Sequence, residues 1–557
     1  MPSYRKLAMR VLGRPLHTGR IDSPRPASQR AAAFILTAAM LTTLAAPAFA
    51  ATWRIEDGDI TVKAGETEGT NKVSQGTIID KVDTDTIITN QNKNIASSNT
   101  VTIEANDKDD KVEVTLKDVN IDTSSRNKAA VSVTGSGNTT IKLDGDNALK
   151  SDSSRSGIYG SGSLTITGGE NDSLTAQGGS GANGIYSSGS LTISGGTVTA
   201  NGGSGANGIS SSGSLTISGG TVTANGDDGG RGISSSGSVT ISGGSTVTAN
   251  GGSGTISGGD GIWSGGGVTI SGGSTVTANG GNGGSLVGGS GISNGGSLTV
   301  SDGTVTAKGG NGDSKDGYGG DGIRSGGGVT ISGNTVNAAG GYGGKVGGYG
   351  ICSFDRVGVA ISGGTVEAAG GNGSAGGGSG IYSSVINLSG SLELTAKAGS
   401  PNGKALSRAG YELDLNDIKD KLGPGAKVTA TDANGETKQV SIPRPVEPEE
   451  SSSSAAPSAP ASPLPGLTVT DKDGQRISYT STQSGNTLTV CVGRFTASFR
   501  ISLAALRQLR AEGIETIAFQ TVLCSTSLSV DELLAMGGED AEAVLTHRFT
   551  DSSLTVG

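Results

Sequence analysis

The sequence predicts an all-β protein, a right-handed parallel β-helix of about eleven coils with three short strands per coil, followed by a small α+β domain. A Gly-Ile pair recurs along the middle of the chain at intervals of 24 to 31 residues. Six residues after most of these isoleucines stands an apolar-polar-apolar triplet, and a third alternating segment follows it. Glycine accounts for 99 of 557 residues and aromatic residues for only 3%, which favours stacked repeats over a compact aromatic core.

Each repeat is interpreted as one coil. Alternation of apolar and polar residues with period two is typical of a strand, and Gly or Ser corners separate the three segments of a repeat. A strand with one or two apolar side chains cannot bury them alone, so the coils must stack on one another. The six-residue offset slips only at Val359 and Ile386. The isoleucines of the Gly-Ile pairs, called anchors below, are Ile158, Ile185, Ile209, Ile233, Ile262, Ile292, Ile323, Ile351 and Ile381.

The two ends of the chain predict export and a separate module. Basic residues precede an apolar run that ends in Ala48-Phe49-Ala50, so residues 1–50 are predicted to be a signal peptide that is cleaved after Ala50. The run is short for a membrane-spanning helix. This predicts a secreted, extracellular protein whose mature chain has no membrane span, with cell-surface association as an alternative.

The remaining boundaries follow from shifts in composition. Residues 51–100 are predicted to be an N-terminal cap with the first strands, 101–400 the β-helix repeats, and 401–442 a C-terminal cap. Residues 443–466 are rich in Pro, Ser and Ala and are predicted to be a disordered linker. Residues 467–557 are predicted to be the small α+β domain, in which Ser502 and Ser529 cap two helices.

Charge and cysteine content argue against several classes of function. The net charge of −9 leaves no basic footprint for nucleic acid. His17 and His547 are the only histidines, which disfavours a zinc site. Three scattered cysteines form no disulfide framework, although pairing of Cys491 with Cys524 is left open. The protein is expected to be a monomer.

The residue after each anchor is predicted to point outward, so that these residues form a column along the rod. Exposed aromatic faces stack on the apolar faces of sugar rings, and this predicts an extracellular polysaccharide or glycan as partner. The alternative is that aromatic residues occupy exposed strand positions because of their β-propensity. The candidate carbohydrate-binding residues are Tyr159, Tyr186, Trp263, Arg324 and Tyr382 in this column and Tyr318, Tyr342 and Tyr349 in the adjacent corner.

Length variation is concentrated in one corner, between the third strand of a repeat and the next anchor, as in NGGSGANG (201–208) and KGGNGDSKDGYGGDG (308–322). Loops that vary along one edge of a solenoid are typical of a binding face. The alternative is that glycine-rich corners tolerate insertions because nothing packs against them. Carboxylates in this corner suit Ca²⁺, the one cofactor considered. The candidate metal ligands are Asp260, Asp313, Asp316 and Asp321.

No catalytic residues are predicted. A polysaccharide lyase on a parallel β-helix needs clustered Asp and a Lys or Arg base, and Arg324 beside Asp321 is the one constellation that fits this description. No pair of carboxylates stands out at matching positions of adjacent repeats, as a glycosidase would require. A lyase-like enzyme is therefore the third hypothesis, after carbohydrate binding and a structural or adhesin-type surface protein.

The run DVNIDTSSRNKAAVSVTGSGNTTIKLDGDNALKS, continuing into GIYGSGSLTITGG and the LTISGGTVTA units, resembles a family of exported carbohydrate-binding β-helix proteins of Gram-positive bacteria. That family is similar in fold to pectate lyases but has no obvious lyase site. The resemblance covers roughly residues 100–400 and implies binding of polysaccharide, with an acidic polysaccharide and Ca²⁺ as one form. It assigns no ligand residues. The leading hypothesis is a secreted or cell-surface, non-catalytic carbohydrate-binding solenoid.

Overall fold

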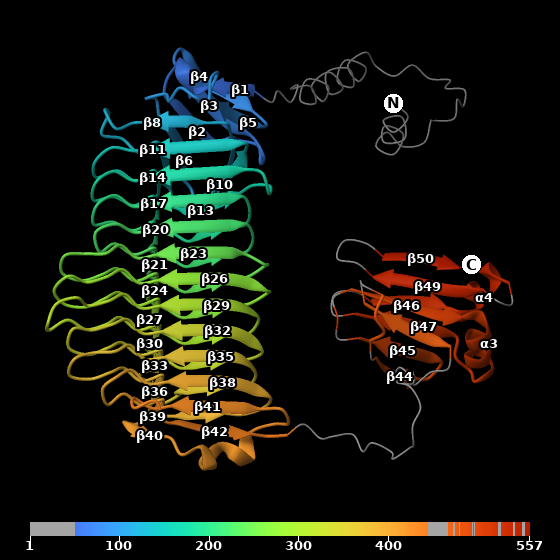
Figure 1. The fold of residues 1–557 in the computed structure, drawn as a ribbon. Helices are drawn as coiled ribbons and strands as arrows, with labels where there is room; N and C mark the ends of the chain where they lie inside the picture. Colours follow the sequence, from blue (N-terminus) through green and yellow to red (C-terminus); the bar gives the residue numbers. More distant parts are fainter. Residues whose placement is uncertain are drawn as a thin grey trace, which may run out of the picture. The chain divides into compact units, whose positions relative to one another are not determined.

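The computed structural model describes residues 51–443 and 466–556, apart from short gaps at 472–473, 478, 493, 495, 522–524, 539–540 and 548–551. The chain divides into two compact units, Met1–Pro445 and Val446–Gly557 (Figure 1). The predicted signal peptide, most of the predicted linker and Cys524 lie outside the described residues. Within the described part of the chain, no helix is both long and apolar enough to span a membrane.

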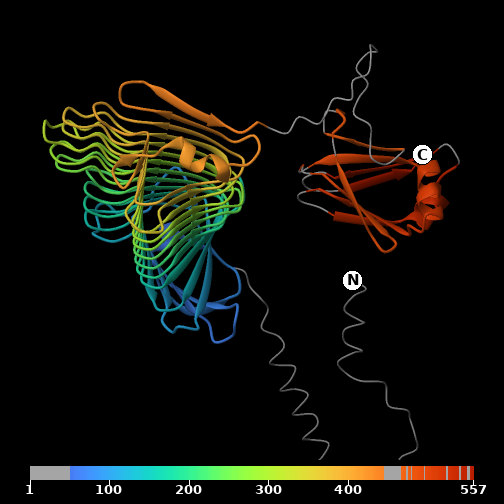
Figure 2. The same cartoon turned by 90° about the horizontal axis from the view of Figure 1, so that it is seen from below.

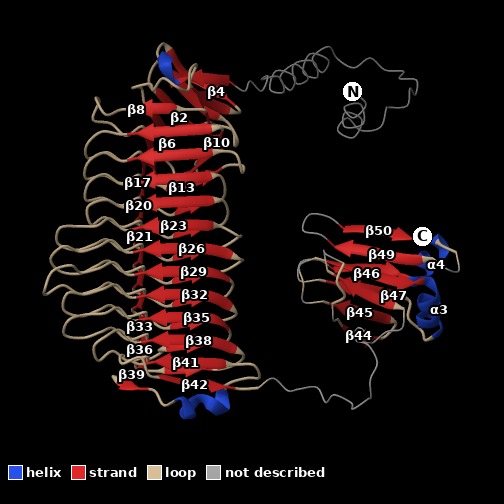
Figure 3. Ribbon diagram, in the orientation of Figure 1, coloured by secondary structure: helices blue, strands red, loops and turns tan. Residues whose placement is uncertain are grey.

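The first unit is a parallel β-solenoid built from three long sheets, in agreement with the predicted fold (Figures 1 and 3). Sheet A holds the triplets. Its thirteen strands, in spatial order, are β1 (Ala51–Arg54), β5 (Thr86–Thr89), β7 (Lys111–Lys117), β10 (Asn138–Asp144), β13 (Ser163–Thr167), β16 (Leu191–Ile193), β19 (Leu215–Ile217), β22 (Val239–Ile241), β25 (Val268–Ile270), β28 (Leu298–Val300), β31 (Val329–Ile331), β34 (Val359–Ile361) and β37 (Ile386–Leu388).

Sheet B holds the anchors. Its sixteen strands, in spatial order, are β4 (Ile78–Asp83), β3 (Asn71–Gln75), β2 (Ile60–Ala64), β6 (Val101–Ala105), β9 (Val131–Gly135), β12 (Ile158–Gly160), β15 (Ile185–Ser187), β18 (Ile209–Ser211), β21 (Ile233–Ser235), β24 (Ile262–Ser264), β27 (Ile292–Asn294), β30 (Ile323–Ser325), β33 (Ile351–Ser353), β36 (Ile381–Ser383), β39 (Leu406–Arg408) and β40 (Tyr411–Glu412).

Sheet C holds the third segments. Its thirteen strands are β8 (Asn120–Asp122), β11 (Asp146–Lys150), β14 (Ser173–Gln177), β17 (Thr197–Asn201), β20 (Thr221–Asn225), β23 (Thr246–Asn250), β26 (Ser274–Asn279), β29 (Gly303–Lys308), β32 (Asn334–Ala339), β35 (Gly364–Ala369), β38 (Leu392–Lys397), β41 (Lys427–Thr431) and β42 (Thr437–Ser441). Two short 3-10 helices, η1 (Ile55–Asp57) and η2 (Leu415–Lys421), lie at the two ends of the solenoid.

The solenoid has more coils than the eleven predicted. Strands β1, β2 and β5 near the N-terminus and β39 and β41 near the C-terminus continue the parallel ladders beyond the recognisable repeats. Antiparallel partners then end the stack: β3 and β4 at one end, β40 and β42 at the other. The sequence count fell short because these terminal coils lack the Gly-Ile anchor.

The core is a set of ladders in which equivalent apolar side chains lie one coil apart. In the coil of residues 184–203, Ile185, Leu191, Ile193 and Val198 are all fully buried. Burial of each such side chain contributes about 1.5–3 kcal/mol relative to exposure. A ladder of buried serines supports the corner between sheets B and A; the Ser211 hydroxyl, for example, donates to Gly189 O at 2.9 Å.

The variable corner between sheet C and the next strand of sheet B is packed. Backbone hydrogen bonds join glycines within a coil and between coils: the Gly289 N–H donates to Gly281 O, and the Gly310 N–H donates to Gly289 O, both at 2.8 Å. A Cβ atom on Gly289 would lie 1.9 Å from Gly259 O. The interpretation that nothing packs against these corners is therefore wrong.

We call the corner segments 251–261, 280–291, 309–322, 340–350 and 370–380 the glycine layer. These segments extend farther from the sheets than the corners of the preceding coils (Figures 1 and 2). Their stacking continues to the tips, where isolated parallel bridges join Gly254, Gly283 and Gly312 in successive coils. The insertions of the longer repeats thus extend the ordered stack.

The second unit is a small α+β fold with its own core. One sheet contains β43 (Leu467–Thr470), β46 (Ala497–Ser502), β49 (Glu542–His547) and β50 (Ser552–Val556), and the other contains β44 (Thr480–Ser484), β45 (Thr487–Cys491), β47 (Thr516–Gln520) and β48 (Ser525–Ser529). The buried rings of Phe499 and Phe519 pack 4.7 Å apart. Ser502 caps α3 (Leu503–Ala511) and Ser529 caps α4 (Val530–Met536), as predicted.

Candidate functional site

The residues that follow the anchors form a continuous column on sheet B, in register from strand to strand. The members of this outward column are Thr102, Ser132, Tyr159, Tyr186, Ser210, Ser234, Trp263, Ser293, Arg324, Cys352, Tyr382 and Ser407. The prediction that every such residue is exposed is wrong for Cys352 and Ser234, which are 0% and 8% exposed, and Ser407 at the end of the column is buried as well. The Cys352 thiol donates to the Asp321 carboxylate at 3.4 Å.

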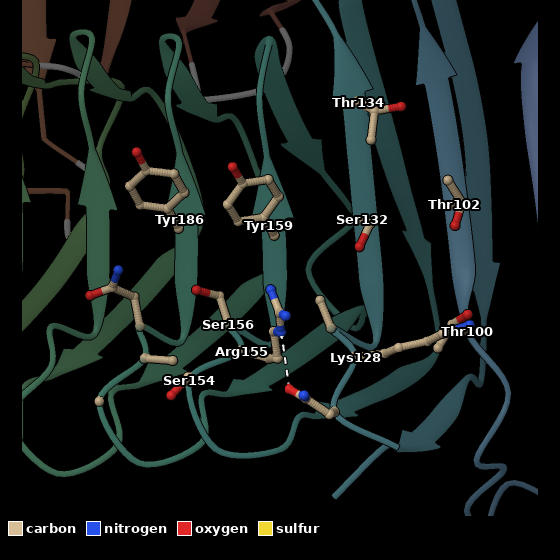
Figure 4. A pocket seen from close by; sticks show the side chains of 15 residues that line it. Thr100, Thr102, Lys128, Ser132, Thr134, Ser154, Arg155, Ser156, Tyr159 and Tyr186 are labelled. Carbon is tan, nitrogen blue, oxygen red and sulfur yellow. Dashed lines mark hydrogen bonds between the residues drawn. The ribbon is translucent and has the colours of Figure 1, made fainter.

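Tyr159 and Tyr186 form a stacked aromatic pair in this column. Their ring centroids are 5.4 Å apart and the ring planes differ by 23°. Parallel pairing of β12 with β15 places the two tyrosines directly opposite each other, which fixes this spacing. Figure 4 shows the rings side by side on neighbouring strands, with their faces visible from the open side. Tyr159 is 43% exposed, so its ring is available to a ligand.

The tyrosine pair lines a groove of about 700 Å³ between the outer face of sheet B and the adjacent corner. The floor beyond Tyr159 is made of small polar residues, Ser132 and Thr102, which occupy the next two positions of the column. The wall comes from three successive corners and includes Asn127, Lys128, Ala129, Ser154, Arg155, Ser156, Gly181, Ala182 and Asn183. A groove with an aromatic end and hydroxyl-rich floor can hold a ligand that combines apolar faces with many hydroxyl groups.

Two cations stand on the groove wall, and they differ in their partners. Lys128 forms an ion pair with Asp59 at 3.2 Å. Burial would raise the pKa of Asp59, but hydrogen bonds from Arg126, the Thr100 amide and Lys128 hold that pKa well below its ordinary value. Within the described part of the chain, Arg155 has no carboxylate within ion-pair distance; its Nε donates to Asn127 Oδ1 at 3.3 Å (Figure 4). Arg155 is thus the cation available to an anionic ligand.

Trp263, the third aromatic residue of the column, is covered by a cation. The Arg231 guanidinium lies 4.4 Å from the centre of the indole ring. Asp260 holds it there, with the Arg231 Nε at 3.3 Å from Asp260 Oδ2. The ring face that would receive a sugar is therefore occupied in this structure.

A second aromatic cluster lies farther along the column. The rings of Tyr349 and Tyr382 stack with centroids 4.8 Å apart, and Phe354 contacts Tyr382 with centroids 6.1 Å apart. The Arg324 guanidinium lies 4.8 Å from the Phe354 ring and forms an ion pair with Asp321 at 3.3 Å. The sequence interpretation missed Phe354, because it belongs to the corner between sheets B and A, which the repeat pattern presents as a plain connection.

Tyr318 and Tyr342 lie away from both aromatic clusters, in the glycine layer. Both are exposed, and the Lys345 ammonium lies 5.7 Å from the Tyr318 ring. The structure therefore does not join all eight predicted residues into one surface. It gathers Tyr159 with Tyr186, and separately Tyr349, Tyr382 and Arg324.

The four candidate metal ligands occupy two kinds of position. Asp260 accepts a hydrogen bond from the Ser290 amide, and Asp321 accepts one from the Tyr349 amide, both at 2.8 Å. Burial raises the pKa of both carboxyls, although each has an arginine beside it. Both therefore serve as links between coils.

Asp313 and Asp316 are exposed in one corner of the glycine layer. Among the described residues, no three His, Cys, Asp or Glu side chains are grouped as a metal site. The residues present thus do not fit a shared Ca²⁺ site formed by these four carboxylates.

Comparison with known proteins gives one match. Residues 94–344, just under half of the chain, match the sequence model of a family described as carbohydrate-binding domain-containing protein. This range includes the whole groove, Trp263 and Arg324, but not Tyr349 or Tyr382. No curated protein and no solved structure matches the chain.

Proposed function

We propose that this chain is a secreted or cell-surface, non-catalytic carbohydrate-binding protein whose groove at Tyr159 and Tyr186 takes an acidic polysaccharide. The observation that carries the proposal is the stacked tyrosine pair at the end of a hydroxyl-lined groove. Aromatic faces stack on the apolar face of a pyranose ring, while the ring hydroxyls need hydrogen-bond partners. Ser132, Thr102 and Asn183 supply such partners beside the stacked pair of Tyr159 and Tyr186, called the tyrosine platform below.

Arg155 supports the choice of an acidic ligand. Its guanidinium has no carboxylate partner among the described residues and lines the same groove as Tyr159. A guanidinium can bind a carboxylate through two parallel hydrogen bonds. A uronic acid stacked on the tyrosine platform would present its carboxylate to such a group, which a neutral sugar cannot do.

The other two hypotheses have weaker support. The lyase hypothesis needs Arg324 as a base near clustered carboxylates, yet Arg324 packs on Phe354 and pairs with the buried Asp321. A structural or adhesin-type role would require the solenoid but would leave the groove without a function. The family match of the groove region supports carbohydrate binding over both.

The test is retention of the full chain on immobilised polygalacturonate, with carboxyl-reduced polygalacturonate as the neutral counterpart. Tyr159→Ala should weaken binding about fivefold or more, because a stacked ring contributes on the order of 1 kcal/mol beyond burial. Tyr411→Ala is the matched control, since Tyr411 is 78% exposed and outside the groove. Arg155→Gln should weaken binding of the acidic form and leave the neutral form unchanged. Equal retention of Tyr159→Ala and Tyr411→Ala, or no retention on any acidic glycan, would contradict the proposal.

The same experiment tests the calcium prediction and the lyase hypothesis. Retention is measured with and without a chelator, and we expect no difference, because the groove offers a guanidinium and hydroxyls rather than grouped carboxylates. A chelator-dependent loss would restore a role for calcium. Unsaturated products released from polygalacturonate would favour the lyase, and Arg324→Ala would then abolish them.

A further inference from the structure

Asp83 is a buried carboxylate without a cation. It ends strand β4 at the N-terminal end of the solenoid and is 1% exposed. Among the described residues, no lysine or arginine lies within ion-pair distance of it. Burying a carboxylate is costly unless it is paired and hydrogen-bonded. Such a residue needs a stabilising partner.

The atoms that contact Asp83 indicate which group could be this stabilising partner. Asp83 Oδ2 accepts a hydrogen bond from Trp53 Nε1 at 2.8 Å. Asp83 Oδ1 accepts one from the Ala51 backbone nitrogen at 3.0 Å and a longer one from the Asp85 amide at 3.3 Å. Ala51 is the first residue of β1 and directly follows the Ala-Phe-Ala motif of the predicted cleavage site. The nitrogen that cleavage would free is therefore already bound to the buried carboxylate.

We propose that Asp83 is the binding site for the α-ammonium group that cleavage between Ala50 and Ala51 creates. A signal peptidase hydrolyses this peptide bond with one water molecule. Ala50 leaves with a carboxylate, and the Ala51 nitrogen takes up a proton at neutral pH. The neutral amide–carboxylate hydrogen bond becomes an ammonium–carboxylate ion pair at the same place.

Processing would then complete the N-terminal cap. Strand β1 is the last strand of sheet A, and its one sheet partner is β5. Such a terminal strand opens readily, because a solenoid coil is held only by its neighbours. The new ion pair fixes β1 to the end of β4, a contact between two different sheets. Processing thus adds an ion pair to the hydrogen bonds that already hold β1 in the precursor.

The test uses the exported, processed full chain. Its N-terminal sequence should begin at Ala51, and a different start would overturn the proposal. Selective carbamylation of the α-amine keeps an N–H donor at Ala51 but removes the charge. Hydrogen exchange of the peptide that contains β1 is then measured in both forms. The carbamylated form should lose about tenfold in protection of β1, which corresponds to about 1.4 kcal/mol.

An Asp83→Asn chain serves as the matched background. It keeps the size and one acceptor oxygen but has no negative charge, so carbamylation should leave the protection of its β1 unchanged. Equal protection of the free and carbamylated forms with Asp83 present would overturn the proposal. So would an equal loss in the Asp83→Asn chain. If that variant does not fold, the comparison of the two forms of the native chain still decides, since it needs no substitution.

Discussion

A single methyl group in the glycine layer should disrupt it. A Cβ atom on Gly289 would lie 1.9 Å from Gly259 O, where ordinary contacts begin near 3.4 Å, so the two backbones must separate by about 1.5 Å. That shift breaks the hydrogen bond of 2.8 Å that the Gly281 N–H donates to Gly259 O, which leaves a buried donor and a buried acceptor unpaired. Each orphaned buried backbone group costs about 1–3 kcal/mol, and overpacking adds about as much. We expect Gly289→Ala to destabilise this region by on the order of 5 kcal/mol.

The assay is hydrogen exchange of the full chain, followed in peptides that cover residues 280–291 and the flanking corners. Gly289→Ala should raise exchange in its own corner and in 251–261 and 309–322, because each coil contacts only its neighbours. Gly376→Ala is the control, since a Cβ on Gly376 meets nothing within 4 Å. Equal protection in both variants would refute the packing argument.

Three further predictions concern residues in and around the outward column. Burial raises the pKa of Asp321, so the folded chain loses stability as pH rises past the ordinary Asp range; Asp321→Asn should melt higher than the parent at pH 7 but not at pH 3. Burial raises the pKa of the Cys352 thiol well above its ordinary value, so iodoacetamide should label Cys491 but not Cys352 until the solenoid unfolds. Removing Phe354 and Tyr382 together should weaken retention of long polysaccharide and leave short oligosaccharides bound at Tyr159.

The architecture could be predicted because its rule is local and repeated. The anchors Ile158 and Ile185 are register partners in sheet B, as the spacing of Gly-Ile pairs requires. The slips at Val359 and Ile386 do not disturb sheet A, where these residues pair with each other. Among the coils with an anchor, only the corners before β34 and β37 differ in length from the equivalent corners of the other coils. The periodicity thus predicts where the strands lie, and differences in repeat length appear as differences in corner length.

The site could be predicted only in part, because it depends on what lies across a corner. The column containing Tyr159 follows from the anchor spacing, and so does its stacking on Tyr186. Arg155 belongs to a corner with no repeat pattern, so its place on the groove wall has no signal in the sequence. The burial of Cys352 could not be predicted for the same reason, because its thiol contacts Asp321, a corner residue. The spacing of the repeat therefore does not specify which side chains of different corners come into contact.

One position in the repeat decides which aromatic faces stay open. This position lies two residues before the anchor. In four coils its side chain accepts a hydrogen bond from a backbone N–H of the next coil; the four residues are Asn183, Asn207, Asp260 and Asp321. An asparagine only links the coils. An aspartate at the same place also attracts a cation, and in both cases that cation is an arginine lying on an aromatic ring.

Arg231 therefore lies on Trp263, and Arg324 on Phe354. A ligand at these rings must displace an arginine and leave a buried carboxylate with less compensation, which costs free energy. The Tyr159–Tyr186 platform lies in coils with Ser156 and Asn183 at this position, and no arginine covers its rings among the described residues. Binding should therefore begin at the tyrosine platform, although tryptophan is the stronger stacking residue.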